Sequence, residues 1–246
     1  MQLHVIKYGD LMGSPDTKDI LLEAGPGTDD AHEQWLAMAE AKLALGWSGQ
    51  ATSALLLAPD HPRGFPAWLD PSFISPDPAT HGQVAVDRAL GALADAGLAT
   101  GDIRTVLVTH DHGDHVDARV LALLPNATVF APVGSSVPGA LPFESRHLDG
   151  LVTCLDTPGH WGPHSSYVID LPHRDLSLCL AGDLAMSHAH LLSLDHPLSF
   201  ADHGAGKASL SRVFAELDSR PTHLKMLLPG HDRAIFVTNR LREMVG

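Results

Sequence analysis

The chain has 246 residues and a formal net charge of −13, which allows a full hydrophobic core and argues against a nucleic-acid partner, since nucleic-acid-binding proteins usually carry basic patches. The N-terminus lacks the apolar run of a secretory signal, and no stretch reaches the length of a membrane span. The two cysteines, Cys154 and Cys179, stand in predicted strands and belong to no metal-binding cluster. We therefore expect a cytoplasmic protein without a membrane partner, built as a single domain over residues 1–246.

The first third of the chain predicts short strands at 3–8 and 19–23 and a helix at about 30–45. Residues 46–79 then combine six prolines with four large aromatic side chains. Because proline interrupts regular elements and aromatic groups require cover, we interpret 46–79 as an ordered insertion packed over the domain. It forms a wall of the substrate pocket or a subunit contact, or it simply packs on the core.

The next elements lead to the most polar stretch of the chain. Apolar residues recur at helical spacing from Val86 to Leu93, where Gly97 can end a helix, and the β-branched run 103–108 predicts a strand. Directly after it comes Thr-His-Asp-His-Gly-Asp-His, residues 109–115. Imidazole and carboxylate groups bind borderline divalent ions, so this stretch predicts a metal site.

Local geometry suggests room for two metals there. Alternation along an extended chain puts His110 and His112 on one side. Gly113 lets the backbone turn, so that Asp114 and His115 reach a neighbouring position.

Three later loops each place one more metal-competent side chain after an apolar run. These loops read Thr-Pro-Gly-His up to His160, Ala-Gly-Asp up to Asp183, and Pro-Gly-His-Asp around His231. We expect strands before them at 152–155, at 176–180 in a hairpin with 166–170, and at 224–228. A short helix at 116–124, a strand at 127–131 and a helix at 207–217 complete the predicted elements.

Together, these four segments resemble the metallo-β-lactamase superfamily, whose motifs run His-x-His-x-Asp-His and then a distant His, Asp and His. Every position of these motifs is filled here, and the resemblance covers about residues 20 to 232. The resemblance implies an α/β fold, a four-layered αββα sandwich. An Asp commonly stands after an early strand of that family, but Glu23 or Ala24 occupies the region here, which puts that support of the ligands in doubt.

The resemblance also implies the ligands of two divalent ions. One ion is held by His110, His112 and His160, the other by Asp114, His115 and His231, and Asp183 bridges the two. Zn²⁺ is the expected metal, while Mn²⁺ or Fe²⁺ suits the same donors. A second histidine of the same loop, His164, either supports the site through hydrogen bonds or has no role in it.

With these ligands the resemblance implies a metal-dependent hydrolase acting on a small molecule. A metal-bound hydroxide, oriented by Asp114 as the catalytic residue, attacks the carbonyl of an ester, lactone, thioester or amide. Secreted β-lactamases place Cys or Ser where Asp183 stands. Lactonases that cleave acyl-homoserine lactones usually place Tyr where Met186 stands, so lactone hydrolysis is unproved.

Three other functions stay open. Persulfide dioxygenases of this fold hold one iron at positions matching His110, His160 and Asp183, and metal count would separate them from a dinuclear hydrolase. Phosphodiesterases and ribonucleases share all seven ligands, and only the acidity of the chain and the lack of a recognisable RNA-binding insertion oppose them. A non-catalytic metal-binding module is the third. The sequence leaves the substrate, the native metal and a homo-oligomeric state undecided.

Overall fold

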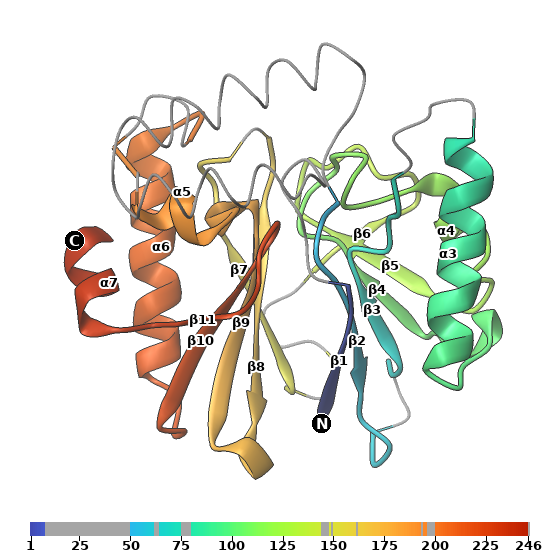
Figure 1. Ribbon diagram of the computed structural model, residues 1–246, viewed down its shortest axis with the longest axis horizontal. Helices are drawn as coiled ribbons and strands as arrows, with labels where there is room; N and C mark the ends of the chain where they lie inside the picture. The colour runs from blue at the N-terminus through green and yellow to red at the C-terminus, as the bar shows by residue number, and fades with distance from the viewer. Residues whose placement is uncertain are drawn as a thin grey trace.

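Two β-sheets lie face to face and helices cover the outer side of each (Figure 1). The computed structural model describes residues 1–7, 50–61, 64–74, 80–143, 148, 150–160, 162–192, 194–195 and 200–245. This arrangement confirms the predicted four-layered αββα sandwich. No helix in these ranges is both long enough and apolar enough to span a membrane.

The first sheet has six strands in the order β1-β2-β3-β4-β5-β6. Their bounds are Gln2–Lys7, Ser53–Leu57, Ala67–Leu69, Thr105–Leu107, Thr128–Ala131 and Leu141–Pro142. β2 is antiparallel to β1 and β3, whereas β3 to β6 run parallel to one another. The loops that follow β3 and β4 therefore leave the same edge of the sheet.

The second sheet has five strands in the order β11-β10-β9-β8-β7. Their bounds, from β7 to β11, are Val152–Asp156, Ser165–Leu171, Leu176–Gly182, Leu224–Pro229 and Ile235–Phe236. β8 and β9 form the predicted hairpin, and β10 lies parallel to β9. Because β7 and β9 are both antiparallel to β8, the loops after β7, β9 and β10 leave the sheet at one edge.

The helices form the two outer layers (Figure 1). α3 (His81–Asp95) and α4 (Ala118–Leu121) cover the first sheet, while α5 (His188–Leu192), α6 (His203–Asp218) and α7 (Asn239–Val245) lie beside the second. α3 ends before Gly97, whose φ of +70° suits glycine, as predicted. α4 is shorter than predicted, and Asp117 caps its N-terminus by accepting a hydrogen bond from the Arg119 amide at 2.8 Å.

Three hydrophobic clusters fill the three interfaces between the layers. Alternation along β4 sends Val106 toward α3 and Leu107 toward the opposite sheet. In β9, Leu178 and Leu180 face the first sheet, whereas Cys179 packs toward α6. Both sheets are thus buried on both faces, so their polar ends are the places left for chemistry.

The prediction of an insertion over 46–79 is wrong for the strands β2 and β3, which are internal strands of the first sheet. Trp68 of β3 is fully buried, donates a hydrogen bond from Nε1 to Ser53 Oγ at 2.9 Å and contacts Phe73 edge to face. Here the aromatic side chains build the core. The prolines do not exclude these strands, because β2 ends before the first of them, Pro59, and the three residues of β3 fit between Pro66 and Pro71.

Several predictions fall outside the described residues. They are the strand at 19–23, the helix at 30–45 and the region of Glu23 and Ala24.

Candidate metal centre

Loops after five strands meet at one end of the two sheets, at the top of Figure 1. They follow β3, β4, β7, β9 and β10 and carry Asp70, residues 109–115, His160, Asp183 and His231, respectively. The structure brings all seven side chains that were predicted as ligands together here, in two groups of metal-competent atoms. The group that contains His110 is called the first group below, the group that contains His115 is called the second, and Asp183 lies between them.

The first group contains His110, His112 and His160 together with Asp183. Nδ1 of His112 lies 3.0 Å from Nε2 of His110 and 3.4 Å from Nε2 of His160. Oδ2 of Asp183 lies 3.7 Å and 3.5 Å from the same two Nε2 atoms. Donors about 2.1 Å from one ion at the corners of a tetrahedron stand about 3.4 Å apart, so this spacing suits a four-coordinate metal.

The second group contains Asp114, His115 and His231. Nε2 of His115 and Nε2 of His231 are 3.4 Å apart, and Oδ2 of Asp114 lies 3.3 Å from the latter and 4.0 Å from the former. Oδ1 of Asp183 completes the group at 3.2 Å from His115 Nε2 and 3.3 Å from His231 Nε2. The donors again have the mutual spacing that a divalent ion requires.

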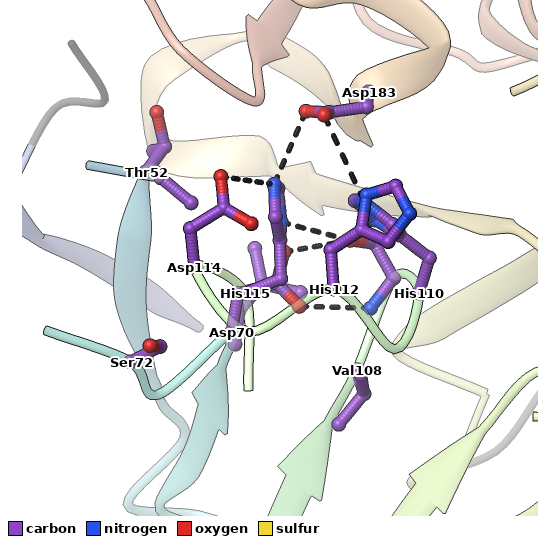
Figure 2. Close-up of polar contacts among 12 residues, drawn as sticks. Thr52, Asp70, Ser72, Val108, His110, His112, Asp114, His115 and Asp183 are labelled. Atoms are coloured by element: carbon purple, nitrogen blue, oxygen red, sulfur yellow. Dashed lines mark hydrogen bonds and ion pairs between the residues drawn. The ribbon is translucent and has the colours of Figure 1, made fainter. Parts of the chain in front are cut away.

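Asp183 therefore faces the first group with one carboxylate oxygen and the second group with the other. Figure 2 shows its carboxylate directed at both His110 and His115. The side chain is buried, and within the described residues its Oδ1 accepts no hydrogen bond. A buried carboxylate oxygen without a hydrogen bond is costly unless a cation lies beside it, so this atom fits a bridging ligand.

Asp70, which follows β3, is a residue of the site that the sequence analysis missed. Its Oδ1 accepts the backbone N–H of Thr109 at 2.8 Å, and its Oδ2 accepts the Thr109 hydroxyl at 2.7 Å and Nδ1–H of His115 at 2.9 Å. The Thr109 hydroxyl has given its only proton to Asp70, so at 3.1 Å it accepts Nδ1–H of His110. One carboxylate thus leaves Nε2 bare on a histidine of each group.

One sequence feature could have identified Asp70 as a site residue. It is an acidic residue directly after an apolar triplet, but it lies in the range that was interpreted as an insertion. Its φ of +44° and its near-complete burial mark it as a constrained position. Asp70 thus supports ligands of both groups through hydrogen bonds.

The other histidines differ in how their second nitrogen is held. His231 donates Nδ1–H to the backbone carbonyl of Gln50 at 2.8 Å, which directs its Nε2 to the second group. Nδ1 of His160 is buried and has no partner among the described residues. His112 differs from the rest because Nδ1 is the atom that faces the group.

His164 supports the centre from behind rather than joining either group. Its Nδ1 lies 2.8 Å from Thr157 Oγ1, which lies 3.0 Å from Ser166 Oγ, and Ser166 donates to the Ala181 carbonyl at 3.0 Å. The only hydroxyl proton of Ser166 is donated to Ala181, so the Thr157 hydroxyl must donate to Ser166 Oγ. Thr157 Oγ1 then has no proton left for His164, so His164 must donate Nδ1–H to it. His164 thus links the loop of His160 to β9, the strand that precedes Asp183, which agrees with the supporting role considered from the sequence.

Burial and charge divide the histidines into two electrostatic classes. Burial lowers the pKa of His110 well below its ordinary value, and it lowers the pKa of His160 to about 4 and that of His164 to about 3. Burial opposes protonation of His115 and His231 as well, yet the Asp183 carboxylate and its neighbours outweigh it and raise both pKa values. The field at the second group therefore favours a cation, and a divalent ion gains more from that field than a proton does.

Close packing of glycine holds the Asp183 turn in place. A Cβ added to Gly230 would lie 2.0 Å from Asp183 Oδ1, and one added to Gly182, whose φ is +54°, would lie 2.7 Å from Thr109 Cβ. By contrast, a Cβ on Gly113 meets nothing within 4 Å, and its φ is not positive. The chain turns at Gly113 as predicted, and Asp114 and His115 reach the second group, but the turn does not require glycine.

Comparison with known proteins gives one partial sequence match and many structural ones. No family model matches the chain. Human metallo-β-lactamase domain-containing protein 1 is 34% identical over 110 residues, which cover 42% of this chain. The match spans 37% of the length of that relative.

Among solved structures, a Thermotoga maritima protein described as a metallo-β-lactamase covers 96% of this chain and 99% of its own, with a TM-score of 0.58 and 16% identity. AidC, a dizinc quorum-quenching lactonase, covers 82% of this chain and 83% of its own, with a TM-score of 0.55 and 17% identity. At these identities the structural matches establish the fold alone.

Proposed function

Since the chain folds as a member of the metallo-β-lactamase superfamily, we propose that it is a dinuclear metal-dependent hydrolase of a small carbonyl substrate. The observation that carries the proposal is the position of Asp183, with one oxygen toward each group of ligands. A side chain buried between two sets of imidazoles in this way suits two cations better than one.

The seven predicted ligands divide between two metal positions in this proposal. Four donors surround the first position and four the second, because Asp183 is counted in both. Imidazole and carboxylate suit Zn²⁺, and Mn²⁺ or Fe²⁺ accept the same donors. When bound, a pair of such ions would polarise a carbonyl oxygen and make water a nucleophile near neutral pH.

The exposure of the ligands indicates where substrate enters. His110, His115, His160, Asp183 and His231 are buried, whereas His112 and Asp114 are partly exposed. Substrate and water therefore approach from the side of His112 and Asp114.

We assign to Asp114 the role of general base, which accepts the proton of the attacking water. Its side chain keeps 16% exposure, and Oδ2 lies 3.3 Å from His231 Nε2, so its carboxylate reaches both the ligands and the solvent. It can accept a hydrogen bond from the attacking water, orient it, and take its proton as the bond to the carbonyl carbon forms. Esters, lactones, thioesters and amides all present such a carbon.

Metal analysis coupled to a substrate screen tests the proposal. The purified chain should bind two zinc ions and hydrolyse at least one carbonyl substrate among ester, lactone, thioester and β-lactam probes. His231→Ala should retain about one ion, because it loses a ligand of the second group alone, and should lose most activity.

A phosphodiester probe is included in the same screen. If the protein hydrolyses only that probe, its substrate is a phosphodiester and the proposed carbonyl substrate is wrong. One iron per chain that is retained in His231→Ala, with oxygen consumption in the presence of a persulfide, would refute the dinuclear hydrolase and favour a one-iron dioxygenase.

A further inference from the structure

Residues 70–74, called the support segment below, run from the end of β3 past the second group of ligands. Two of its five residues, Asp70 and Ser72, contact the loop that carries Asp114 and His115, and a third, Ile74, is linked to His231 through Gln50. Asp70 holds His115 directly, at 2.9 Å between Oδ2 and Nδ1. Ser72 and Ile74 act through backbone groups of other residues.

Ser72 holds the turn that carries Asp114. Its Oγ donates a hydrogen bond of 2.7 Å to the backbone carbonyl of Gly113. Gly113 is the residue between His112 and Asp114, so this bond fixes the direction in which the Asp114 side chain leaves the loop. Nothing in the backbone of Gly113 itself forces the turn, since its φ is not positive.

Ile74 holds His231 through Gln50. The Gln50 side chain donates Nε2–H to the Ile74 carbonyl at 2.5 Å and accepts the Ile74 N–H at 3.1 Å through Oε1. The backbone carbonyl of Gln50 then accepts Nδ1–H of His231 at 2.8 Å. A side chain paired with both polar groups of one peptide residue fixes the place of its own carbonyl, and with it the orientation of the His231 ring.

Lys7, the last residue of β1, completes the contacts of Gln50. Its Nζ donates to Gln50 Oε1 at 3.2 Å and to the Ala51 carbonyl, and lies 5.1 Å from the centre of the Phe73 ring. The ammonium group thus binds Gln50 and the backbone carbonyl of the next residue. Gln50 is held between β1 and the support segment.

The first group has no such contact with Ser72 or Gln50 in the described part of the chain. His160 stands on a loop that is tied to α6 by the 2.7 Å hydrogen bond from Ser209 Oγ to the Pro158 carbonyl. His110 shares Asp70 with the second group through Thr109. Asp70 therefore supports both groups, whereas Gln50 and Ser72 support the second group alone.

We propose that Gln50 is a positioning residue for the second metal position, which sets the affinity of that position without changing the first. The inference rests on the proposed dinuclear function. Gln50 touches neither metal nor substrate and acts by holding the carbonyl that orients His231. Ser72 acts in the same sense on Asp114.

Zinc titration of the full-length chain against a competing chelator tests this inference. His160→Ala and His231→Ala identify which binding step belongs to which group. Gln50→Met keeps the length of the side chain but removes its hydrogen bonds, so it should weaken the step that His231→Ala abolishes by about 10–100-fold and leave the other step unchanged. Gln50→Glu keeps both contacts of Oε1, with the Ile74 N–H and with Lys7, but puts an acceptor oxygen where Nε2 donated to the Ile74 carbonyl, so it should recover at most part of the loss.

The matched control is Gln83→Met on α3, where the glutamine side chain bonds only Asp87 at the surface within the described residues. It should leave both steps at the wild-type affinity. Denaturant unfolding of the metal-free proteins should show that Gln50→Met remains folded.

The outcomes separate the inference from the function on which it rests. Two zinc ions in the wild type, with a second step that Gln50→Met leaves unchanged, would refute the inference but not the hydrolase. Equal weakening of both steps in Gln50→Met would refute the selective role. A wild-type chain with a single zinc step would refute the dinuclear function, and the inference with it.

Discussion

Oδ2 of Asp70 lies 2.9 Å from Nδ1 of His115, although 45 positions separate the two residues in the chain. The same oxygen accepts the hydroxyl of Thr109, which in turn accepts Nδ1–H of His110. Figure 2 shows Asp70 directly beneath His115, on the side away from Asp183. A single buried carboxylate therefore fixes the ring nitrogen that is free for metal in each of the two groups.

The first prediction follows from this contact. Asp70→Asn keeps the shape of the side chain but replaces one acceptor oxygen by a donor, which faces the N–H and O–H groups of Thr109 and His115. We expect zinc affinity to fall by about 10–100-fold at both positions. Zinc titration against a chelator measures this, and Asp102→Asn at the distant 3₁₀ turn is the matched control. Wild-type affinity in Asp70→Asn would contradict the assignment.

The second prediction concerns the glycine behind Asp183. Gly230→Ala places a methyl group 2.0 Å from Asp183 Oδ1, so the carboxylate must move away from the two histidine groups. We expect the bound metal to drop below one ion per chain and the activity to be lost. Gly113→Ala is the comparison from the same site, since its methyl group meets nothing within 4 Å, and it should retain metal. Metal analysis after desalting reads out both variants, and equal occupancy in the two would count against the packing argument.

The third prediction concerns the pH dependence of the metal-free protein. Burial lowers the pKa of His164 to about 3, whereas the unfolded chain has the ordinary value near 6.5. Between these values the unfolded state binds the extra proton, so the stabilising contribution of neutral His164 is present above about pH 6.5 and is lost as the pH falls. Each extra proton bound by the unfolded state adds up to about 1.4 kcal/mol per pH unit to the slope of the free energy of unfolding against pH.

Comparison with His164→Gln isolates that contribution. The variant should show a shallower decline in the free energy of unfolding between pH 6.5 and pH 4 than the wild type, whatever its stability at pH 7. Denaturant unfolding in the presence of a chelator gives the two slopes. Identical slopes would show that His164 is not buried in its neutral form.

The fourth prediction concerns metal removal. The ligands come from the ends of β4, β7, β9 and β10, so bound metal links the two sheets. A ligand at about 1,000 times its dissociation constant stabilises the folded state by about 4 kcal/mol. We therefore expect zinc to raise the thermal midpoint of the chelated protein by several degrees, and by less in His231→Ala. No response to zinc in calorimetry would contradict a metal centre at this edge.

The sequence alone determined the features that depend on neighbouring residues. The run 103–108 followed by the His-rich stretch predicted a strand that ends in ligands, and β4 does so because β-branched residues favour strands and the polar residues cannot continue into the core. The hairpin of β8 and β9 and the helix α6 were likewise predictable from alternation and helical spacing.

Only the tertiary structure decided how the ligands are held. Asp70 and Gln50 reach the histidines by contacts between segments far apart in the chain, since 45 positions separate Asp70 from His115 and 181 separate Gln50 from His231. No local period encodes such contacts, because a hydrogen bond between distant segments depends on sheet order and strand register. For the same reason the sequence did not reveal that β2 and β3, which lie in the proline-rich range 46–79, are internal strands paired on both sides.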